Sequence, residues 1–261
     1  MELAIYQVDA FASEVFEGNP AAVCPLDNWL ADDTLQKIAE ENNLSETAFF
    51  VKNEDSFSLR WFTPEAEVDL CGHATLAAAH VLFTHLRYSG QTIQFDTKSG
   101  PLLVQRSGVV YSMDFPASIP VSTEAPGALI DGLGITPQEV LCAYDYIAVL
   151  GSETDLKSVN PNFIKLSQLD KRGVVITAPG ASNDIDFVSR CFYPKLRVNE
   201  DPVTGSAHCQ LAPYWSQQFK KDVLLAKQLS KRTGLIHCEL HSNRVSLKGG
   251  AIDYLHGSIK I

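Results

Sequence analysis

The amino-acid sequence predicts an α+β protein made of two similar lobes of strands and helices. Two glycine turns carry this prediction: in both Glu67–Ala74 and Glu200–Ala207, a Glu stands five residues before a Gly, and an apolar, helix-favouring run follows. The turns are 133 positions apart, and Ser99-Gly100 and Thr233-Gly234 resemble each other at a spacing of 134. A period of this length is typical of duplicated domains rather than of short stacked repeats.

Length and composition suit two lobes. A chain of 261 residues with 45% hydrophobic content can form two cores in lobes of roughly 130 residues each. We therefore predict an N-terminal lobe over residues 1–118 and a C-terminal lobe, the duplicate of the first, over residues 119–261. The Pro-rich and Ser-rich stretch 116–134 is interpreted as the link, and the last strand could pack back on the N-terminal lobe.

The N-terminal half is predicted to place strands around one buried helix. A first helix, with Leu35, Ile38 and Ala39 at helical spacing, is expected to begin at Asp32 or Asp33, whose carboxylates can cap it, and to close at Asn42-Asn43. The second helix, over 74–86, is apolar on almost every face, which is typical of a helix inside a lobe. Strands or short apolar runs are expected at about 3–11, 21–24, 47–52, 57–62, 92–95, 102–105 and 109–115.

The C-terminal half is predicted to repeat this plan. A helix is expected over 207–219, directly after the second glycine turn. The basic residues between Lys220 and Arg232 are interpreted as the solvated face of a helix. Strands are expected at about 143–150, 173–178, 187–193 and 235–247.

Charge and cysteine usage exclude several classes of protein. A net charge of −10 disfavours nucleic acid and anionic membranes as partners, because both are polyanions. The sequence shows no signal segment and no apolar run long enough to span a membrane, so we expect a cytoplasmic protein. The six cysteines lack the dense spacing of a disulfide framework and are expected to be reduced, mostly as core residues.

The glycine turns themselves predict anion binding. Backbone N–H groups at the start of a helix have no partner within the helix, and the helix dipole adds partial positive charge there. Glycine lets a ligand approach the backbone closely, and Ser206 or Thr204 can donate a hydroxyl hydrogen bond to a carboxylate. We therefore expect a small-molecule carboxylate as the ligand.

Four motifs, present together and in order, resemble the PhzF-like phenazine biosynthesis family. This resemblance covers nearly the whole chain and implies the diaminopimelate epimerase-like fold, in which each of two pseudo-symmetric lobes wraps a curved mixed sheet around a central helix. It also implies an active site in the cleft between the lobes and is compatible with a homodimer. The motifs are Gly18-Asn19-Pro20-Ala21-Ala22-Val23, Asn43-Leu44-Ser45-Glu46-Thr47-Ala48-Phe49, Cys71-Gly72-His73-Ala74-Thr75 and Glu200-Asp201-Pro202-Val203-Thr204-Gly205-Ser206-Ala207.

The resemblance further implies cofactor-independent proton transfer between carbons of a conjugated substrate. By motif match Glu46 is the carboxylate that removes and returns the proton, while His73 and Asp201 match polar residues that contact the substrate, and these three are the candidate catalytic residues. Without the resemblance, each of the three is read more simply as a turn, edge or helix-start residue. The candidate substrate-binding residues are Cys71, Gly72, Thr204, Gly205 and Ser206.

A two-thiol epimerase is a second possibility within this fold, and the sequence disfavours it. Amino-acid epimerases of this fold resemble racemases that place a Cys before the glycine in both lobes. Here Cys71 fills the first position, but Thr204 fills the second, and a hydroxyl cannot exchange a proton as a thiol does. Whether Cys71 assists Glu46 or only packs in the core stays open.

Other chemistries find little support in the sequence. The stretch 132–137 lacks the third glycine of a dinucleotide-binding turn, and no phosphate-binding loop or hydrolase Gly-x-Ser-x-Gly turn occurs. Neither His237 and His241 nor His73 and His80 come with a third ligand, so no metal is predicted. We therefore expect an isomerase that acts on a small carboxylated, unsaturated or cyclic metabolite; the alternative from a different class is a non-catalytic protein that binds a small anion or metabolite.

Overall fold

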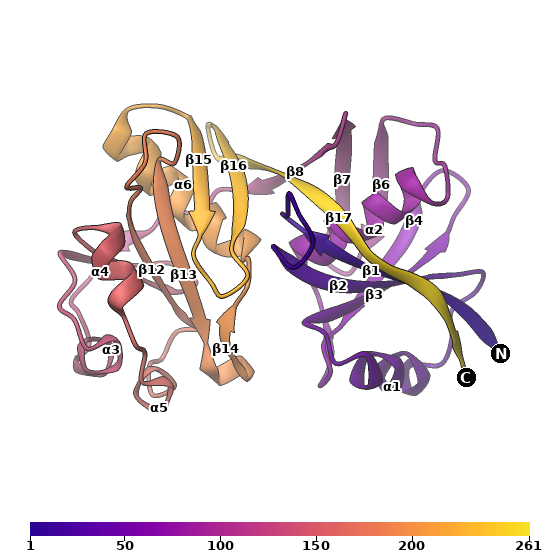
Figure 1. Cartoon of the computed structure of the whole chain (residues 1–261), viewed down its shortest axis with the longest axis horizontal. Coiled ribbons are helices and arrows are strands. Elements are labelled where there is room, and N and C mark those ends of the chain that lie inside the picture. The colour runs from indigo at the N-terminus through magenta and orange to yellow at the C-terminus, as the bar shows by residue number, and fades with distance from the viewer. The chain divides into compact units, whose positions relative to one another are not determined.

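The chain passes twice between two folded units in the computed structural model, which describes all residues from Met1 to Ile261 (Figure 1). The first unit comprises Met1–Asp114 together with Lys248–Ile261, and the second comprises Phe115–Leu247. The structure therefore divides the chain a few residues before the predicted boundary at 118. It assigns the last residues of the chain to the first unit.

A mixed sheet forms the first unit. Its neighbouring strands are antiparallel except for two parallel pairs, β2 with β3 and β4 with β6. The C-terminal part of β17 (Arg244–Lys260) pairs antiparallel with β1, so both chain ends lie at the same end of this unit (Figure 1). The other strands are β1 (Glu2–Ala10), β2 (Asn19–Leu26), β3 (Glu46–Lys52), β4 (Phe57–Phe62), β5 (Glu67–Val68), β6 (Thr92–Thr97), β7 (Gly100–Ser107) and β8 (Val110–Pro116).

The central helix of the first unit is α2 (Gly72–Thr84). Alanine and leucine favour a helix here, and every residue from His73 to Phe83 is buried, as the apolar pattern predicts. α2 packs against β1, β2 and β3. Because burial of one large apolar side chain contributes about 1.5–3 kcal/mol, the packing of this helix fixes the position of its amino end, where His73 lies.

The amphipathic helix α1 (Asp32–Asn42) closes another part of the core of the first unit. Its buried Leu35 and Ala39 lie in a cluster with Phe49 of β3. The prediction that an aspartate caps this helix is wrong, because the N-cap is Ala31 and no side chain accepts a hydrogen bond there. Asp32 lies instead in the first turn and accepts a hydrogen bond from Arg60, where its negative charge still suits the helix dipole.

The second unit has its own mixed sheet and its own core. The strands are β9 (Val121–Ser122), β10 (Glu139–Cys142), β11 (Tyr146–Val149), β12 (Val174–Pro179), β13 (Phe187–Tyr193), β14 (Val198–Asp201), β15 (Val223–Gln228), β16 (Gly234–His241) and the start of β17. The helices are α3 (Gly127–Leu133), α4 (Glu153–Ser158), α5 (Phe163–Leu166), the short 3₁₀ turn Pro194–Leu196 and α6 (Gly205–Phe219). Figure 1 shows α3, α4 and α5 grouped at one edge of this unit.

The two units repeat the same order and pairing of elements. In each, an antiparallel pair is followed by a parallel pair, β2–β3 in the first and β11–β12 in the second. A further antiparallel strand, β4 or β13, then leads through a short strand to the central helix. The strand after that helix pairs parallel with this further strand, as β4–β6 and β13–β15. We propose internal duplication as the origin of this repetition.

Two expected features of the second half differ in the structure. The stretch 116–134, expected only to link the lobes, contains β9 and α3, and the apolar residues Leu129 and Leu133 of α3 are buried in the core of the second unit. The basic stretch expected on a helix includes β15, where Leu224 and Ala226 alternate with more exposed residues. The alternation has the period of a strand, which the lysine spacing masks in the sequence.

All six cysteines are free thiols, and five of them are buried. No helix combines the length and the apolar composition that crossing a membrane requires.

Candidate active site

Glu46 stands at the first position of β3, where the chain enters the sheet. Its strand runs parallel to β2, with Glu46 paired to Ala21. The preceding Asn43 adopts a left-handed conformation that ends α1 and turns the chain toward the sheet. The residues that follow Glu46, 47–50, are buried, whereas the side chain of Glu46 itself is 17% exposed.

The Gly-Asn-Pro motif holds the loop in front of Glu46. The Ser45 hydroxyl donates a hydrogen bond of 3.0 Å to Oδ1 of Asn19, which is fully buried. Gly18 precedes Asn19 with a φ of +65°, and a Cβ at this position would lie 2.2 Å from the carbonyl oxygen of Ala10. The glycine therefore permits a turn that no other residue could make without strain. Two motifs that are separate in sequence thus meet next to Glu46.

The glutamate of the first glycine turn, Glu67, anchors the start of α2. Arg60 of β4 donates two hydrogen bonds to the Glu67 carboxylate, at 2.7 and 2.9 Å, and Lys98 donates another at 2.6 Å. The hydrogen bonds from Arg60 lower the pKa of Glu67 to about 2, so the carboxylate stays charged at neutral pH. Glu67 is therefore a structural residue that positions Cys71 and His73.

Three chemically active side chains meet at the amino end of α2. His73 Nε2 lies 2.9 Å from Glu46 Oε2, and His73 Nδ1 lies 3.5 Å from the sulfur of Cys71. Glu46 Oε2 is buried, and His73 is the polar group that contacts it. No further hydrogen bond reaches this oxygen. We call Glu46, Cys71 and His73 the triad. It combines a carboxylate, an imidazole and a thiol in one largely buried place.

The protonation states of the triad follow from burial and charge. Burial raises the pKa of the Cys71 thiol, and the negative charge of Glu46 raises it further, so Cys71 is a thiol at neutral pH. Burial alone would lower the pKa of His73, but the contacts of its imidazole with Cys71 and Glu46 raise this pKa well above its usual value. Because Cys71 is neutral, the carboxylate of Glu46 is the acidic group that favours the protonated form of His73.

The ligand atoms of the triad also lie within 4.8 Å of one another, close enough to hold a metal ion. Such an ion would have to displace the protons that His73 and Cys71 carry at neutral pH. That competition favours proton chemistry, and the absence of a catalytic metal stays a prediction.

Titration of His73 should report its pairing with Glu46. We expect its imidazole to titrate well above the usual value in the native protein, and its pKa to fall in E46Q, because burial remains while the anion is lost. Side-chain nitrogen resonances in an NMR pH titration measure both values. The matched control is His208, whose burial lowers its pKa to about 4 and should do so in both proteins.

The raised pKa of His73 also fixes the direction of a pH effect on stability. A histidine whose pKa is higher in the folded than in the unfolded state stabilises the fold fully below about pH 6.5. This contribution should disappear as the pH rises through the folded-state pKa, and it should be smaller in E46Q. An unchanged titration of His73 in that variant would contradict the pairing.

The second glycine turn holds Asp201 at the end of β14. The Thr204 hydroxyl donates a hydrogen bond of 2.5 Å to Asp201 Oδ2. Gln228, fully buried on β15, fixes this turn: its Oε1 accepts from the Thr204 amide at 2.9 Å, and its Nε2 donates to the Asp201 carbonyl at 2.7 Å. The carboxylate of Asp201 is therefore oriented by its neighbours rather than free to rotate.

Ser206, in the first turn of α6, is linked to a buried ion pair. Arg172 donates hydrogen bonds to the fully buried carboxylate of Asp145 at 3.0 and 2.7 Å, and also to Ser206 Oγ at 2.9 Å. Gln210 adds a hydrogen bond of 2.8 Å to Asp145. The guanidinium therefore places positive charge beside the amino end of α6, where an anion would be favoured.

The repeated turns are matched in structure but differ in chemistry. In each unit an arginine on the preceding strand binds the turn glutamate through two hydrogen bonds: Arg60 binds Glu67, and Arg190 binds Glu200 at 2.7 and 3.1 Å. Thr204 occupies the place of Cys71 before its helix. The second unit therefore offers a hydroxyl where the first offers a thiol.

Strand register identifies the counterpart of Glu46 in the second unit. Thr47 pairs with Phe62 in the first unit, and Val174 pairs with Phe192 in the second, so the counterpart of Glu46 is Gly173. A Cβ at Gly173 would lie 2.2 Å from the ring of Tyr193. No carboxylate can stand there, and the second unit therefore lacks a base at the position that Glu46 occupies in the first.

Of the predicted site residues, the structure brings together Glu46, Cys71 and His73, with Gly72 between the last two. The others, Asp201, Thr204, Gly205 and Ser206, are grouped in the second unit. The cleft that would unite both groups stays a prediction.

The sequence analysis did not identify several residues that support these groups. Arg60 and Arg190 stand immediately before the matching pairs Trp61-Phe62 and Cys191-Phe192, so their repetition was a signal in the sequence. Arg172 carries no such signal, because its partners Asp145 and Ser206 are distant in the chain.

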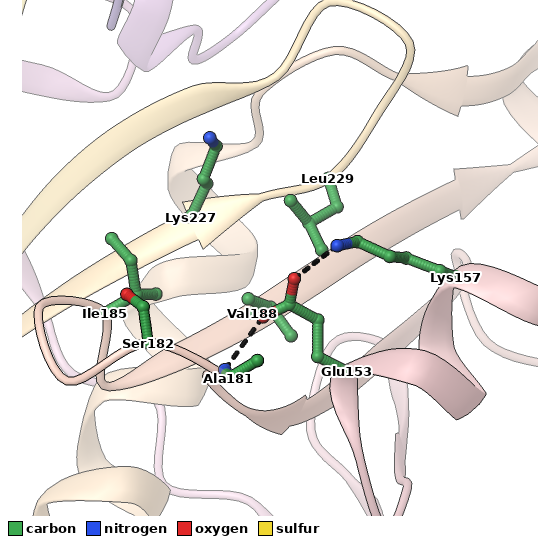
Figure 2. A pocket seen from close by; sticks show the side chains of 8 residues that line it. All are labelled: Glu153, Lys157, Ala181, Ser182, Ile185, Val188, Lys227 and Leu229. Carbon is green, nitrogen blue, oxygen red and sulfur yellow. Dashed lines mark hydrogen bonds and ion pairs between the residues drawn. The ribbon is translucent and has the colours of Figure 1, made fainter.

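A pocket of about 330 Å³ in the second unit contains none of the predicted site residues (Figure 2). Figure 2 shows its carboxylate, Glu153, held between Lys157 at 2.5 Å and the backbone amide of Ala181 at 2.9 Å. This carboxylate is already paired with groups of the pocket itself. The triad is therefore the better candidate for acid/base chemistry.

Comparisons with known proteins agree with this fold. The family model described as phenazine biosynthesis-like protein (PhzC-PhzF) matches residues 8–257. A Pseudomonas aeruginosa protein named an uncharacterized isomerase is 51% identical over 261 residues, which cover 100% of both chains. The crystal structure of a PhzF-family phenazine biosynthesis protein from Enterococcus faecalis is 46% identical, covers 100% of both chains and gives a TM-score of 0.97.

A more distant structure shares the fold alone. The hydroxyproline epimerase from Agrobacterium vitis is 9% identical, with 99% of this chain and 92% of that chain covered and a TM-score of 0.62. Fold and relatives together define an isomerase with the α+β, diaminopimelate epimerase-like architecture. The chain belongs to the phenazine biosynthesis-like (PhzF) family.

Proposed function

We propose that this isomerase moves a proton between two carbons of a small carboxylated, unsaturated or cyclic metabolite, without a cofactor, and that Glu46 is its acid/base group. The carboxylate of Glu46 takes a proton from a C–H bond of the substrate, and the electron pair of that bond moves into the conjugated system. The double bond shifts, and the protonated Glu46 returns the proton to the other carbon. Proton and electrons balance without an external oxidant or reductant.

The observation that carries this proposal is the 2.9 Å contact between Glu46 Oε2 and His73 Nε2 in a largely buried place. The imidazole lies within hydrogen-bond distance of the carboxylate and holds it in place. His73 is the polar group that contacts Oε2, and no further hydrogen bond to this oxygen stands in the way of a substrate C–H group. Burial strengthens the interaction of these charges with a bound substrate.

The start of α2 supports the choice of a carboxylated substrate. No side chain caps this helix, and its first turn carries no acidic residue. The same holds for α6, which additionally has Arg172 bound to Ser206. Uncapped amides with partial positive charge favour carboxylate groups. The net charge of −10 makes these positive places exceptions on an acidic protein.

The difference between the units supports one base rather than two. An epimerase with two bases needs a proton-exchanging group on each side of the substrate carbon. The second unit has Gly173 and Thr204 at the places of Glu46 and Cys71, and neither can exchange a proton near neutral pH. A single carboxylate that removes and returns the same proton fits this arrangement.

Exchange of substrate hydrogens in heavy water tests the proposal against a non-catalytic binding protein. Small unsaturated acids that raise the melting temperature of the protein are selected first. Each is then incubated with the protein in deuterium oxide and analysed by mass spectrometry. We expect deuterium at carbon positions and a change in the double-bond position. A ligand that binds tightly and gains no deuterium would support the binding protein instead.

Substitution of Thr204 tests the orientation of Asp201. T204V removes the hydroxyl that holds Asp201 Oδ2 at 2.5 Å, whereas T204S keeps it. A lost hydrogen bond of this kind costs about 1.5 kcal/mol, so kcat/KM should fall roughly tenfold in T204V and only slightly in T204S. Equal activity of the two variants would mean that the hydrogen bond from Thr204 to Asp201 does not contribute to catalysis.

A further inference from the structure

A second cluster of potential ligands lies at the other end of α2. His80 and His85 both direct Nε2 to the same carboxylate oxygen, Asp253 Oδ1 of β17, at 3.1 and 2.9 Å. These three ligand atoms lie within 4.8 Å of one another, and all three residues belong to the first unit. The proposed proton transfer uses none of them.

The spacing of these atoms suits a tetrahedral metal ion. Zinc binds histidine nitrogens and carboxylate oxygens at about 2.0–2.2 Å, so neighbouring ligands of one ion are roughly 3.3 Å apart. The two contacts of Asp253 Oδ1 are shorter than this by only a few tenths of an ångström. An ion could enter with small side-chain rotations, and two histidines with one carboxylate leave one position for water.

The surroundings hold the first histidine in a binding orientation. His80 Nδ1 lies 2.9 Å from the hydroxyl of Tyr111, whose ring packs edge-on against the imidazole. Histidines that bind metals usually bond their second ring nitrogen to a protein group, which fixes the tautomer and the orientation of the ring. Tyr111 can supply this bond, because its hydroxyl can accept from Nδ1–H when Nε2 binds an ion.

The cluster is also accessible, and its aspartate has no basic residue other than histidine as an ion-pair partner. The side chain of Asp253 is 41% exposed and that of His85 is 23% exposed, so solvent reaches the cluster, while His80 is only 10% exposed. The ion pairs of Asp253 are with these two histidines and not with a lysine or arginine. A cation would therefore take the place of the protons on the histidine nitrogens, although the nearby positive charge of Arg106, which also acts on His80, opposes it.

We propose that His80, His85 and Asp253 form a binding site for a divalent transition-metal ion such as Zn²⁺. The ion would join the end of α2 to β17, which is the last strand of the chain. Its role is structural, because the site lies at the carboxyl end of the helix whose amino end carries His73. Metal binding should therefore raise the melting temperature of the protein.

Titration of Zn²⁺ into metal-free protein tests this site by calorimetry. We expect one ion per chain, and a loss of affinity of at least about tenfold in D253N and in H85N. Y111F should weaken binding by about 10–100-fold through loss of the bond to His80. The matched control is H241Q, because His241 is an exposed histidine beside a carboxylate, Glu239 at 3.4 Å, and should bind as the native protein does.

Cobalt spectroscopy separates this site from the triad, which contains a thiol. Co²⁺ bound to His80, His85 and Asp253 should show visible absorption without a sulfur-to-metal charge-transfer band, and C71S should leave the spectrum unchanged. A sulfur band that C71S abolishes would place the ion at the triad and overturn the proposal. Failure of native protein to bind Zn²⁺, or unchanged binding in both D253N and H85N, would also overturn it. If D253N fails to fold, H85N and the native cobalt spectrum still decide.

Discussion

The E46Q variant should lose between a hundredfold and ten-thousandfold of the rate of proton exchange into the substrate. General acid/base catalysis by a positioned side chain contributes about this factor. Glutamine keeps the size and much of the polarity of glutamate, but it cannot accept and return a proton. Glu46 is the single carboxylate of the triad, so the substitution leaves no second carboxylate there to replace it. The measurement is deuterium uptake by the ligand in heavy water, followed by mass spectrometry.

Binding must be measured beside exchange in the same variant. We expect E46Q still to bind the ligand, shown by a ligand-dependent rise of melting temperature, because the amide ends of α2 and α6 are unchanged. The matched control is E54Q, an exposed glutamate in the turn after β3, which should exchange at the native rate. Native turnover in E46Q would refute the assignment of Glu46, whereas loss of binding as well would show that Glu46 contributes to the shape of the site.

The D145A variant should lower the free energy of unfolding by about 2–4 kcal/mol. Asp145 is fully buried and accepts hydrogen bonds from Arg172 and Gln210. Removal of one partner from a buried ion pair costs about 3–5 kcal/mol. We reduce this figure because the Arg172 side chain is 37% exposed and water can solvate part of the guanidinium once its partner is lost. Urea denaturation followed by circular dichroism measures the change.

An exposed pair in the same unit provides the matched control. Asp131 is 63% exposed and lies 3.7 Å from Lys165, so D131A should change stability by less than about 1 kcal/mol. The double variant D145A/R172A should be less destabilised than the sum of the two single variants, because the second change removes the unpaired cation. Equal stabilities of D145A and D131A would mean that the buried pair does not stabilise the second unit.

Much of the fold was predictable because its signals are local. The all-apolar run after the first glycine turn predicted a buried helix, and α2 is buried from His73 to Phe83. The strand from Phe57 to Phe62 was predicted with its observed ends, because apolar residues alternate there with the polar residues Ser58 and Arg60. The stretch 116–134 was misinterpreted as a link, because its prolines and serines hide Leu129 and Leu133, which only packing reveals as core residues.

The candidate site was predictable only in part. Motifs identified Glu46 and His73 as site residues, but nothing in the sequence placed Glu46 Oε2 within 2.9 Å of the imidazole. The same limit applies to Arg172, Asp145 and Ser206, whose contacts join three separate segments of the second unit. Contacts of this kind depend on how strands and helices pack, and not on spacing along the chain.

The sequence by itself determined the family, the repeated glycine turns and the types of residue available for proton transfer, because each depends on residues close together in the chain. Tertiary structure decided which of these residues act on one another. It brought Cys71 and His73 to Glu46, joined Asp253 to two histidines of the central helix region, and left Gly173 where a second base would stand. The physical reason is that protonation, ion pairing and metal binding depend on distances of a few ångströms between atoms, which the folded chain alone sets.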